Sequence, residues 1–168
     1  MRKIAVVLGF ALIAALSGCG GSPAPDLPAE SLRDLIGGPG RYRYVDPVVS
    51  EIVAETGVPL DVLIRLIESE SSWRVHVRSC IRQDGTYDIG LAQINVAYLD
   101  YFTAEYMEGA LDPLHPVDSL RFAARYLGDL RRKTGNWEDA VVAYKSGLGR
   151  VGSEPVWVRR IAVWVVRG

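Results

Sequence analysis

The sequence predicts a mainly α-helical protein with one small β or irregular patch. Apolar residues recur with helical spacing in several segments, and residues that start or end helices separate these segments. The stretch from 80 to 95 breaks the pattern, because it is rich in Gly, Asp and Tyr and contains Asp84-Gly85, a pair typical of tight turns. Hydrophobic residues make up 49% of the chain and charged residues 23%, which indicates a globular rather than a disordered protein.

Five helices are expected, and each has a start signal. The starting residues, in chain order, are Asp46-Pro47, Pro59, Asp118, Asn136 and Pro155. The first of these helices ends at Gly57. The apolar faces expected to point inward on the last three helices are Leu120, Ala123, Ala124, Leu127 and Leu130; Trp137, Ala140, Val141 and Tyr144; and Trp157, Ile161, Trp164 and Val165.

The second helix carries a carboxylate on its apolar face. Glu70 continues the stripe of Leu63, Leu66 and Ile67 and should point toward the core, whereas Glu68 falls on a solvated face. Apolar surroundings raise the pKa of a carboxyl group, which a general acid working near neutral pH requires. The alternative is that Glu70 lies at a frayed helix end and reaches water.

Charge and residue counts exclude several classes of function. The net charge of −1 provides no basic surface for nucleic acid, so a DNA- or RNA-binding domain is not expected. Two His and two Cys are too few for most zinc modules. No phosphate-binding loop of the GxxxxGK(S/T) type is present. We therefore expect neither a metal nor a cofactor.

The N-terminus predicts export and a lipid anchor. A positively charged start precedes an apolar run of 13 residues, Ile4 to Leu16. This run is shorter than the ~20 residues of a membrane-spanning helix. Leu16-Ser17-Gly18-Cys19 then resembles the lipobox of bacterial lipoproteins, in which the cysteine is acylated after cleavage. We therefore expect a lipoprotein signal peptide at 1–18, with an ordinary secretory signal as the alternative.

The next segment, 19–45, is expected to be the lipidated N-terminus and a flexible tether, followed by one domain at 46–168. Gly20-Gly21-Ser22-Pro23-Ala24-Pro25 and Gly37-Gly38-Pro39-Gly40 both break regular structure. Such a tether could span up to ~80 Å. Gly20 rather than Asp follows the cysteine, which favours the outer membrane in a cell with two membranes.

Three motifs in the predicted domain resemble those of one enzyme family. Glu70-Ser71-Ser72-Trp73 resembles the E-S-x-F/W signature of lytic transglycosylases with a goose-lysozyme-like, soluble-transglycosylase domain. The segment Asp88 to Asn95, DIGLAQIN, resembles their second motif, commonly G-L-M/F-Q-I. The segment Ala143 to Val151, AYKSGLGRV, resembles their third, A-Y-N-A-G-x-G-R-V. The motifs occur in family order and cover nearly all of the domain.

This resemblance implies a lysozyme-like helical fold and a reaction on peptidoglycan. The family cleaves the β-1,4 bond between N-acetylmuramic acid and N-acetylglucosamine and leaves 1,6-anhydro-N-acetylmuramic acid ends. By resemblance, Glu70 is the catalytic residue, first as general acid and then as general base. The expected partners are peptidoglycan glycan strands, the membrane through the lipid anchor, and an envelope-spanning secretion or division machine. The expected location is the outer membrane, facing the periplasm.

The resemblance also implies substrate-binding residues: Ser71, Gly90, Gln93, Tyr144 and Lys145. The last of these departs from the family pattern, because Lys145 and Ser146 replace the usual Asn-Ala. A lysine there could hydrogen-bond substrate or lower the pKa of the catalytic carboxyl through its charge.

Two other functions stay open from the residues alone. A lysozyme-type muramidase would hydrolyse the same bond, with Asp84 or Asp88 positioning a water, although turn hydrogen bonds already account for both. A non-catalytic peptidoglycan-binding scaffold of the envelope would keep the anchor and the cleft but would not need Glu70.

The anchor leads to a first prediction. Cys19→Ala should move the protein from the membrane fraction to the soluble fraction, because the acyl chains contribute ~0.8 kcal/mol of membrane affinity per buried methylene. Fractionation followed by mass measurement of the mature N-terminus checks this. Unchanged membrane partition of the variant would contradict it.

Overall fold

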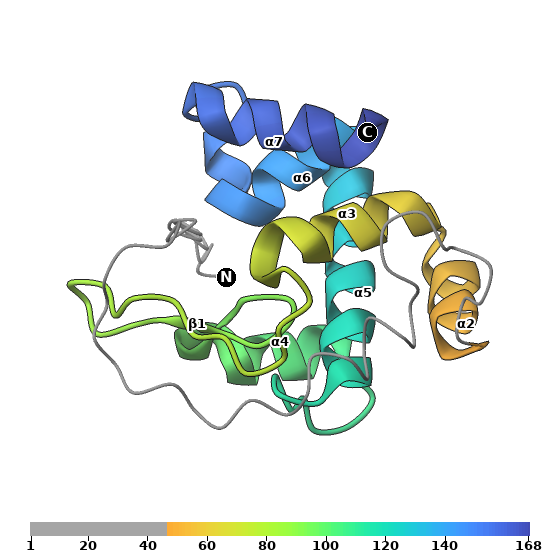
Figure 1. Cartoon of the computed structure of the whole chain (residues 1–168), viewed down its shortest axis with the longest axis vertical. Coiled ribbons are helices and arrows are strands. Elements are labelled where there is room, and N and C mark those ends of the chain that lie inside the picture. Colours follow the sequence, from red (N-terminus) through yellow and green to blue (C-terminus); the bar gives the residue numbers. More distant parts are fainter. Residues whose placement is uncertain (1–46) are drawn as a thin grey trace, which may run out of the picture.

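The computed structural model describes residues 47–168 and confirms the mainly helical class (Figure 1). Its elements, in chain order, are α2 (Pro47–Thr56), α3 (Leu60–Ser71), β1 (Asp88–Ile89), β2 (Ile94–Asn95), the 3-10 helix η1 (Val96–Tyr98), α4 (Leu99–Tyr106), α5 (Pro116–Thr134), α6 (Trp137–Ser146), the 3-10 helix η2 (Leu148–Arg150) and α7 (Val156–Arg167). None of these helices combines the length and the apolar character of a membrane span. The predicted signal peptide, Cys19 and the tether lie outside the described residues.

The predicted helix ends are confirmed where a local hydrogen bond or a glycine defines them. At the start of α6, the Asn136 side chain accepts a hydrogen bond from the Asp139 amide at 2.8 Å, as its capping role requires. α2 ends before Gly57, as predicted; α5 ends before Gly135, which was not predicted, and both glycines have positive φ. α5 begins at Pro116, three residues before the start expected directly after Asp118, because proline is well suited to the first turn of a helix.

α4 and the aromatic cluster around it were not predicted. The helix has only eight residues and a weak apolar pattern, so periodicity gave no signal for it. It buries Phe102 and Tyr106 against Phe122 and Tyr126 of α5, and the Phe102 and Phe122 ring centroids lie 4.8 Å apart. Packing against α5 therefore stabilises a segment whose own sequence favours a helix only weakly.

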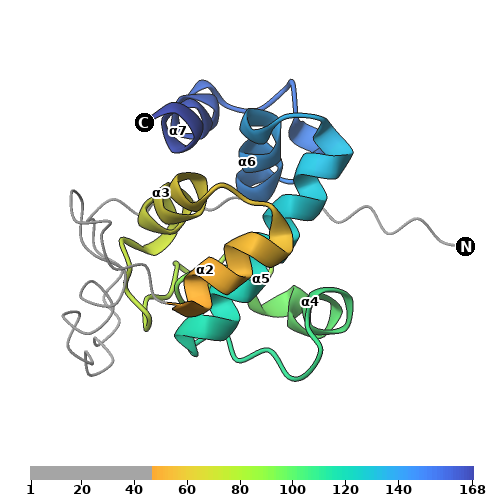
Figure 2. The same ribbon diagram turned by 90° about the vertical axis from the view of Figure 1, so that its right-hand side faces the viewer.

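The helices are arranged around α5, which runs through the middle of the domain (Figure 1). α6 and α7 lie toward one end of it, and α4 and the β strands lie toward the other. Figure 2 shows α3 between α7 and α2, and α3 packs directly on α7. The predicted inner face of α5 is buried throughout, and on α6 Val142 and Ala143 are buried as well as the predicted Ala140 and Val141. α6 is therefore enclosed on more than one side.

The predicted orientation of α7 is partly wrong. Trp157 and Trp164, expected inside, are 37% and 43% exposed, whereas the neighbouring stripe of Val158, Ala162 and Val165 is buried. Both stripes have helical spacing, so periodicity alone does not choose between them. α7 packs on α3 and α6, and close helix contacts accommodate small side chains better than indoles.

The patch between α3 and α4 is a small antiparallel β pair, as predicted. Asp88 pairs with Asn95 and Ile89 with Ile94, and Gly90 follows the first strand. The predicted turn at Asp84-Gly85 is also present, because the Gly85 amide donates to the Arg82 carbonyl at 2.9 Å. Gly90 is buried with φ of +78°, and a Cβ there would lie 1.9 Å from the Pro113 carbonyl oxygen. The patch is therefore pressed against the loop before α5.

This close approach leads to a second prediction. Gly90→Ala should lower the free energy of unfolding by about 3 kcal/mol or more, because left-handed backbone strain adds to a steric clash. Gly85→Ala is the matched control, since Gly85 also has positive φ but a Cβ added there would have no atom within 4 Å. The control should cost about 1 kcal/mol. Urea unfolding measures both, and equal losses would contradict the prediction.

Candidate active site

Glu70 lies in the last turn of α3 and points into the protein, as the apolar stripe predicted. Its side chain is only 2% exposed. The helix ends directly after it: Ser72 and Trp73 both have positive φ, and the Ser72 amide closes the last turn on the Glu68 carbonyl at 3.0 Å. Glu70 is thus fixed at the end of a packed helix where the chain changes direction, and it is not at a frayed end.

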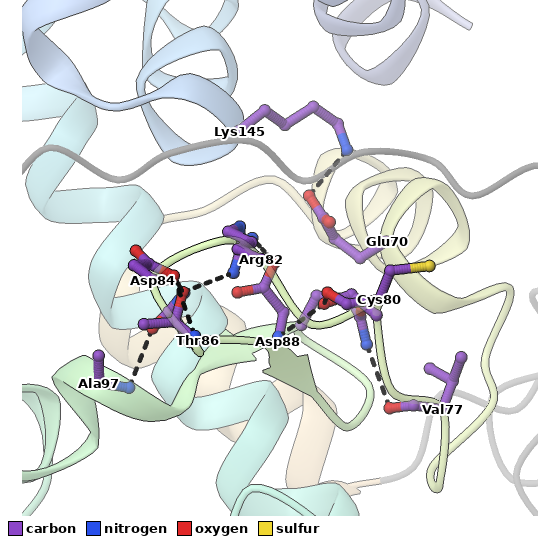
Figure 3. Close-up of polar contacts among 12 residues, drawn as sticks. Glu70, Val77, Cys80, Arg82, Asp84, Thr86, Asp88, Ala97 and Lys145 are labelled. Atoms are coloured by element: carbon purple, nitrogen blue, oxygen red, sulfur yellow. Dashed lines mark hydrogen bonds and ion pairs between the residues drawn. The ribbon is translucent and has the colours of Figure 1, made fainter. Parts of the chain in front are cut away.

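Lys145 is the immediate partner of this carboxylate. Its Nζ donates to Glu70 Oε1 at 2.8 Å, and its side chain is completely buried. Figure 3 shows Lys145 reaching from α6 toward Glu70 on α3. Charged side chains are rarely buried unless they are paired, so each of the two accounts for the burial of the other. The substitution that departs from the family pattern therefore contacts the predicted acid itself.

Burial sets the pKa of Glu70. Loss of solvent raises it, the charge and hydrogen bond of Lys145 oppose this rise, and the nearby Asp88 carboxylate adds a smaller increase. The pKa lies above the ordinary value for a glutamate, so Glu70 holds its proton to a higher pH than an exposed glutamate would. This is the property that the apolar stripe predicted for a general acid.

Asp88 is the acidic residue that sequence reasoning undervalued. Its side chain is buried and forms an ion pair with Arg82, and its amide donates to Ser79 Oγ at 2.8 Å. Burial raises the pKa of its carboxyl, and Arg82 opposes the rise. Asp84, in contrast, is exposed and accepts turn hydrogen bonds from Thr86. The turn role that was expected of both acids therefore holds for Asp84 alone.

Most of the predicted site residues line one pocket. It is lined by Glu70, Asp88, Gln93, Ile94, Asn95, Phe102, Phe122, Tyr126, Tyr144 and Lys145. Its volume of ≈ 30 Å³ suits a water molecule and is too small for a sugar ring. The rings of the α4–α5 aromatic cluster form one wall, which explains how these unpredicted residues contribute to the site. The pocket brings two buried carboxylates and one buried lysine together.

Gln93 and Tyr144 line the pocket, and their polar groups bond to the backbone. The Tyr144 hydroxyl donates to the Ala92 carbonyl at 2.9 Å and does not bond to Glu70. Gln93 has a φ of +49°, and its Nε2 donates to the carbonyls of Gly90 at 2.9 Å and Val77 at 3.3 Å. The Tyr144 bond holds the third motif against the second, and the Gln93 bonds tie the second motif to itself and to Val77.

Ser71 and Gly90 lie outside the pocket lining. The buried Ser71 hydroxyl donates to the Ile67 carbonyl of its own helix at 3.3 Å. The backbone approach at Gly90 is toward Pro113, as described above. Within residues 47–168, no three His, Cys, Asp or Glu side chains are grouped in a way that could hold a metal ion. The chemistry that the site offers is proton transfer at Glu70.

Comparisons with known proteins agree with the motifs. A family model described as "Transglycosylase SLT domain" matches residues 48–156, which confirms the resemblance. No curated protein matches the chain. Among solved structures, the 70 kDa soluble lytic transglycosylase from Escherichia coli has a TM-score of 0.55 and 20% identity, covering 74% of this chain and 19% of that one.

Two further structures give the same picture of the fold. An inactive mutant of the lytic transglycosylase Slt from Pseudomonas aeruginosa has a TM-score of 0.53 and 17% identity, covering 71% of this chain and 20% of that one. A complex of the 70-kDa soluble lytic transglycosylase with bulgecin A has a TM-score of 0.54 and 21% identity, covering 70% of this chain and 18% of that one. This chain therefore spans about a fifth of each of these larger proteins.

The contact between the motifs leads to a third prediction. Tyr144→Phe should lower the free energy of unfolding by about 1–2 kcal/mol, because the buried Ala92 carbonyl loses its donor. Tyr101→Phe is the control, since Tyr101 is 42% exposed and its loss of a hydroxyl should change stability by less than about 0.5 kcal/mol. Urea unfolding compares the two, and equal effects would count against a structural role for the hydroxyl.

Proposed function

The chain belongs to the transglycosylase SLT domain family, and we propose that it is a lytic transglycosylase of peptidoglycan. It cleaves the β-1,4 bond between N-acetylmuramic acid and N-acetylglucosamine and leaves 1,6-anhydro-N-acetylmuramic acid ends. The observation that carries this proposal is Glu70, a buried carboxyl with a raised pKa at the end of α3, in the motif position of the family's acid.

Glu70 performs both proton transfers of the reaction. The protonated carboxyl donates to the glycosidic oxygen, and the bond to C1 of the muramic acid breaks as N-acetylglucosamine leaves. The acetamido oxygen of the muramic acid attacks C1 and takes the place of an enzyme nucleophile. Glu70, now a carboxylate, removes the proton of the C6 hydroxyl, and O6 displaces the acetamido oxygen from C1. The proton lent to the leaving group is thereby replaced, and no water is consumed.

The other predicted residues divide by their surroundings. Gln93 and Tyr144 line the pocket beside Glu70 and bond to backbone carbonyls, which supports a role in fixing the segments that border the acid, with the glycan bound outside the pocket. Ser71 and Gly90 contribute through the backbone, since the former bonds to its own helix and the latter permits a close approach of two loops. These roles would keep the end of α3 and the β patch in a fixed relation to the glycan.

The N-terminal segment gives the enzyme its place in the cell. Lipidation at Cys19 would hold it at the outer membrane facing the periplasm, and the tether at 19–45 would let the domain reach the glycan strands. Family membership supports a location in the cell envelope, where peptidoglycan lies. Service to an envelope-spanning secretion or division machine fits the same arrangement.

Hydrolysis is the second candidate reaction, and Asp88 is the observation that favours it. Its buried carboxylate lines the same water-sized pocket as Glu70. A second carboxylate that activates a water is the usual arrangement in hydrolysing glycosidases. The ion pair with Arg82 holds Asp88 in place, which is compatible with either a structural or a water-positioning role.

Analysis of the products tests the proposal and gives a fourth prediction. The full mature chain, purified in detergent, should release from intact peptidoglycan muropeptides that are lighter by one water than reducing-end products and that resist borohydride. Glu70→Gln should lower this rate by at least ~100-fold, because an amide cannot donate the catalytic proton. Its amide oxygen can still accept the hydrogen bond from Lys145, and the buried ammonium can lose its proton once its counter-charge is gone, so the fold should be kept at a lower stability.

Glu68→Gln is the matched control, two residues away on the same helix and partly exposed, and it should keep the wild-type rate. Digests with reducing ends alone would overturn cyclisation and assign hydrolysis, with Asp88 as the water-positioning residue. Bound glycan without new ends would identify a non-catalytic scaffold.

A further inference from the structure

A buried lysine bonded to the catalytic acid is the feature of this site that the proposed reaction does not use. Lys145 Nζ lies 2.8 Å from Glu70 Oε1, with side-chain exposures of 0% and 2%. Desolvating two charges is costly, and an ion pair so placed persists only with good geometry and close packing. Moving the lysine into solvent would break its hydrogen bond to Glu70 and leave that carboxylate buried without its cation.

The charged and titratable groups that face Glu70 come from three elements. Lys145 and Tyr144 belong to α6, Asp88 to β1 and Tyr126 to α5, and all of them line the pocket. Burial raises the pKa of both tyrosines further above neutrality, so they stay uncharged in the working range. Among the described residues that line this pocket, Lys145 is the only cation.

We propose that Lys145 is a positioning residue that favours the carboxylate form of Glu70 over the protonated form and thereby sets the upper pH limit of catalysis. This inference rests on the proposed function, because a pH limit requires an acid-dependent reaction. The ammonium group stabilises only the charged form of the carboxyl, so it opposes the effect of burial and of Asp88. Fewer molecules then carry the protonated acid at a given pH.

The sign of the effect follows from which form is stabilised. Removing the lysine charge leaves burial and Asp88 unopposed, so the pKa of Glu70 rises and the acid stays protonated to a higher pH. Lys145→Met is nearly isosteric and removes only the charge and the hydrogen bond. Its basic limb of kcat/KM against pH should therefore move upward, whereas a substrate-binding lysine would chiefly change KM.

The experiment measures the proton on Glu70 directly and the activity separately. NMR titration of glutamate carboxyl carbons, with Glu70→Gln assigning the signal, should show the pKa of Glu70 about one unit or more higher in Lys145→Met. The basic limb of kcat/KM should move by the same amount. Lys133→Met is the matched control, because it removes the charge of an exposed lysine paired with Asp129, and neither quantity should move. An unchanged Glu70 titration in Lys145→Met would overturn the inference.

Two further measurements test the inference if the Lys145→Met variant is unstable. Lys145→Met leaves a buried carboxylate without its cation, so any loss of stability should grow as the pH rises through the raised pKa of Glu70. The double variant Glu70→Gln with Lys145→Met should remove that pH dependence. Instability that is equal at all pH values, and that the second change does not relieve, would overturn the inference.

Failure of the proposed function has a different signature. A shifted Glu70 titration in a protein whose wild type cuts no glycan would support the ion-pair role and overturn the catalytic proposal. A Lys145→Met variant that cuts glycan at the wild-type rate, with an unshifted basic limb, would support the catalytic proposal and overturn the ion-pair role.

Discussion

The buried ion pair between Glu70 and Lys145 is the constraint around which this domain is organised. It joins the last turn of α3 to the last turn of α6, two segments 75 residues apart in the chain. Neither charge could be buried there without the other, since an isolated buried charge costs far more than a paired one. The close packing of α6 on α5 and of α7 on α3 buries both side chains away from bulk solvent and so keeps their electrostatic interaction strong.

Two contacts to backbone carbonyls hold the β patch against the helices. Tyr144 donates to the Ala92 carbonyl, and Gly90 permits the patch to touch the loop at Pro113. Both contacts connect the second motif to elements far away in sequence. They also bring the Asp88 carboxylate to the pocket of Glu70, where its negative charge raises the pKa of the acid. Residues that look like binding groups in the sequence thus act first as supports.

Opposing electrostatic effects of this kind suit a group that must act in both directions. A carboxyl whose pKa were raised by burial alone would be protonated at the start but would give up its proton reluctantly, whereas a carboxylate held by a lysine alone would be deprotonated at the start and a weak base. Here burial and the Asp88 charge raise the pKa of Glu70, and Lys145 lowers it. In a lytic transglycosylase one carboxyl acts first as general acid and then as general base. Opposing effects on its pKa therefore serve both steps.

The sequence by itself determined the helical class, four of the five expected helix starts in the described part of the chain, the motif family and the inward direction of Glu70. These depend on local periodicity, capping and motif order. Only the tertiary structure decided that Trp157 faces outward, that α4 forms, and that Asp88 and Lys145 meet the acid. The reason is that helical spacing fits two neighbouring faces equally well, and a charge's burial depends on partners that fold against it from distant segments.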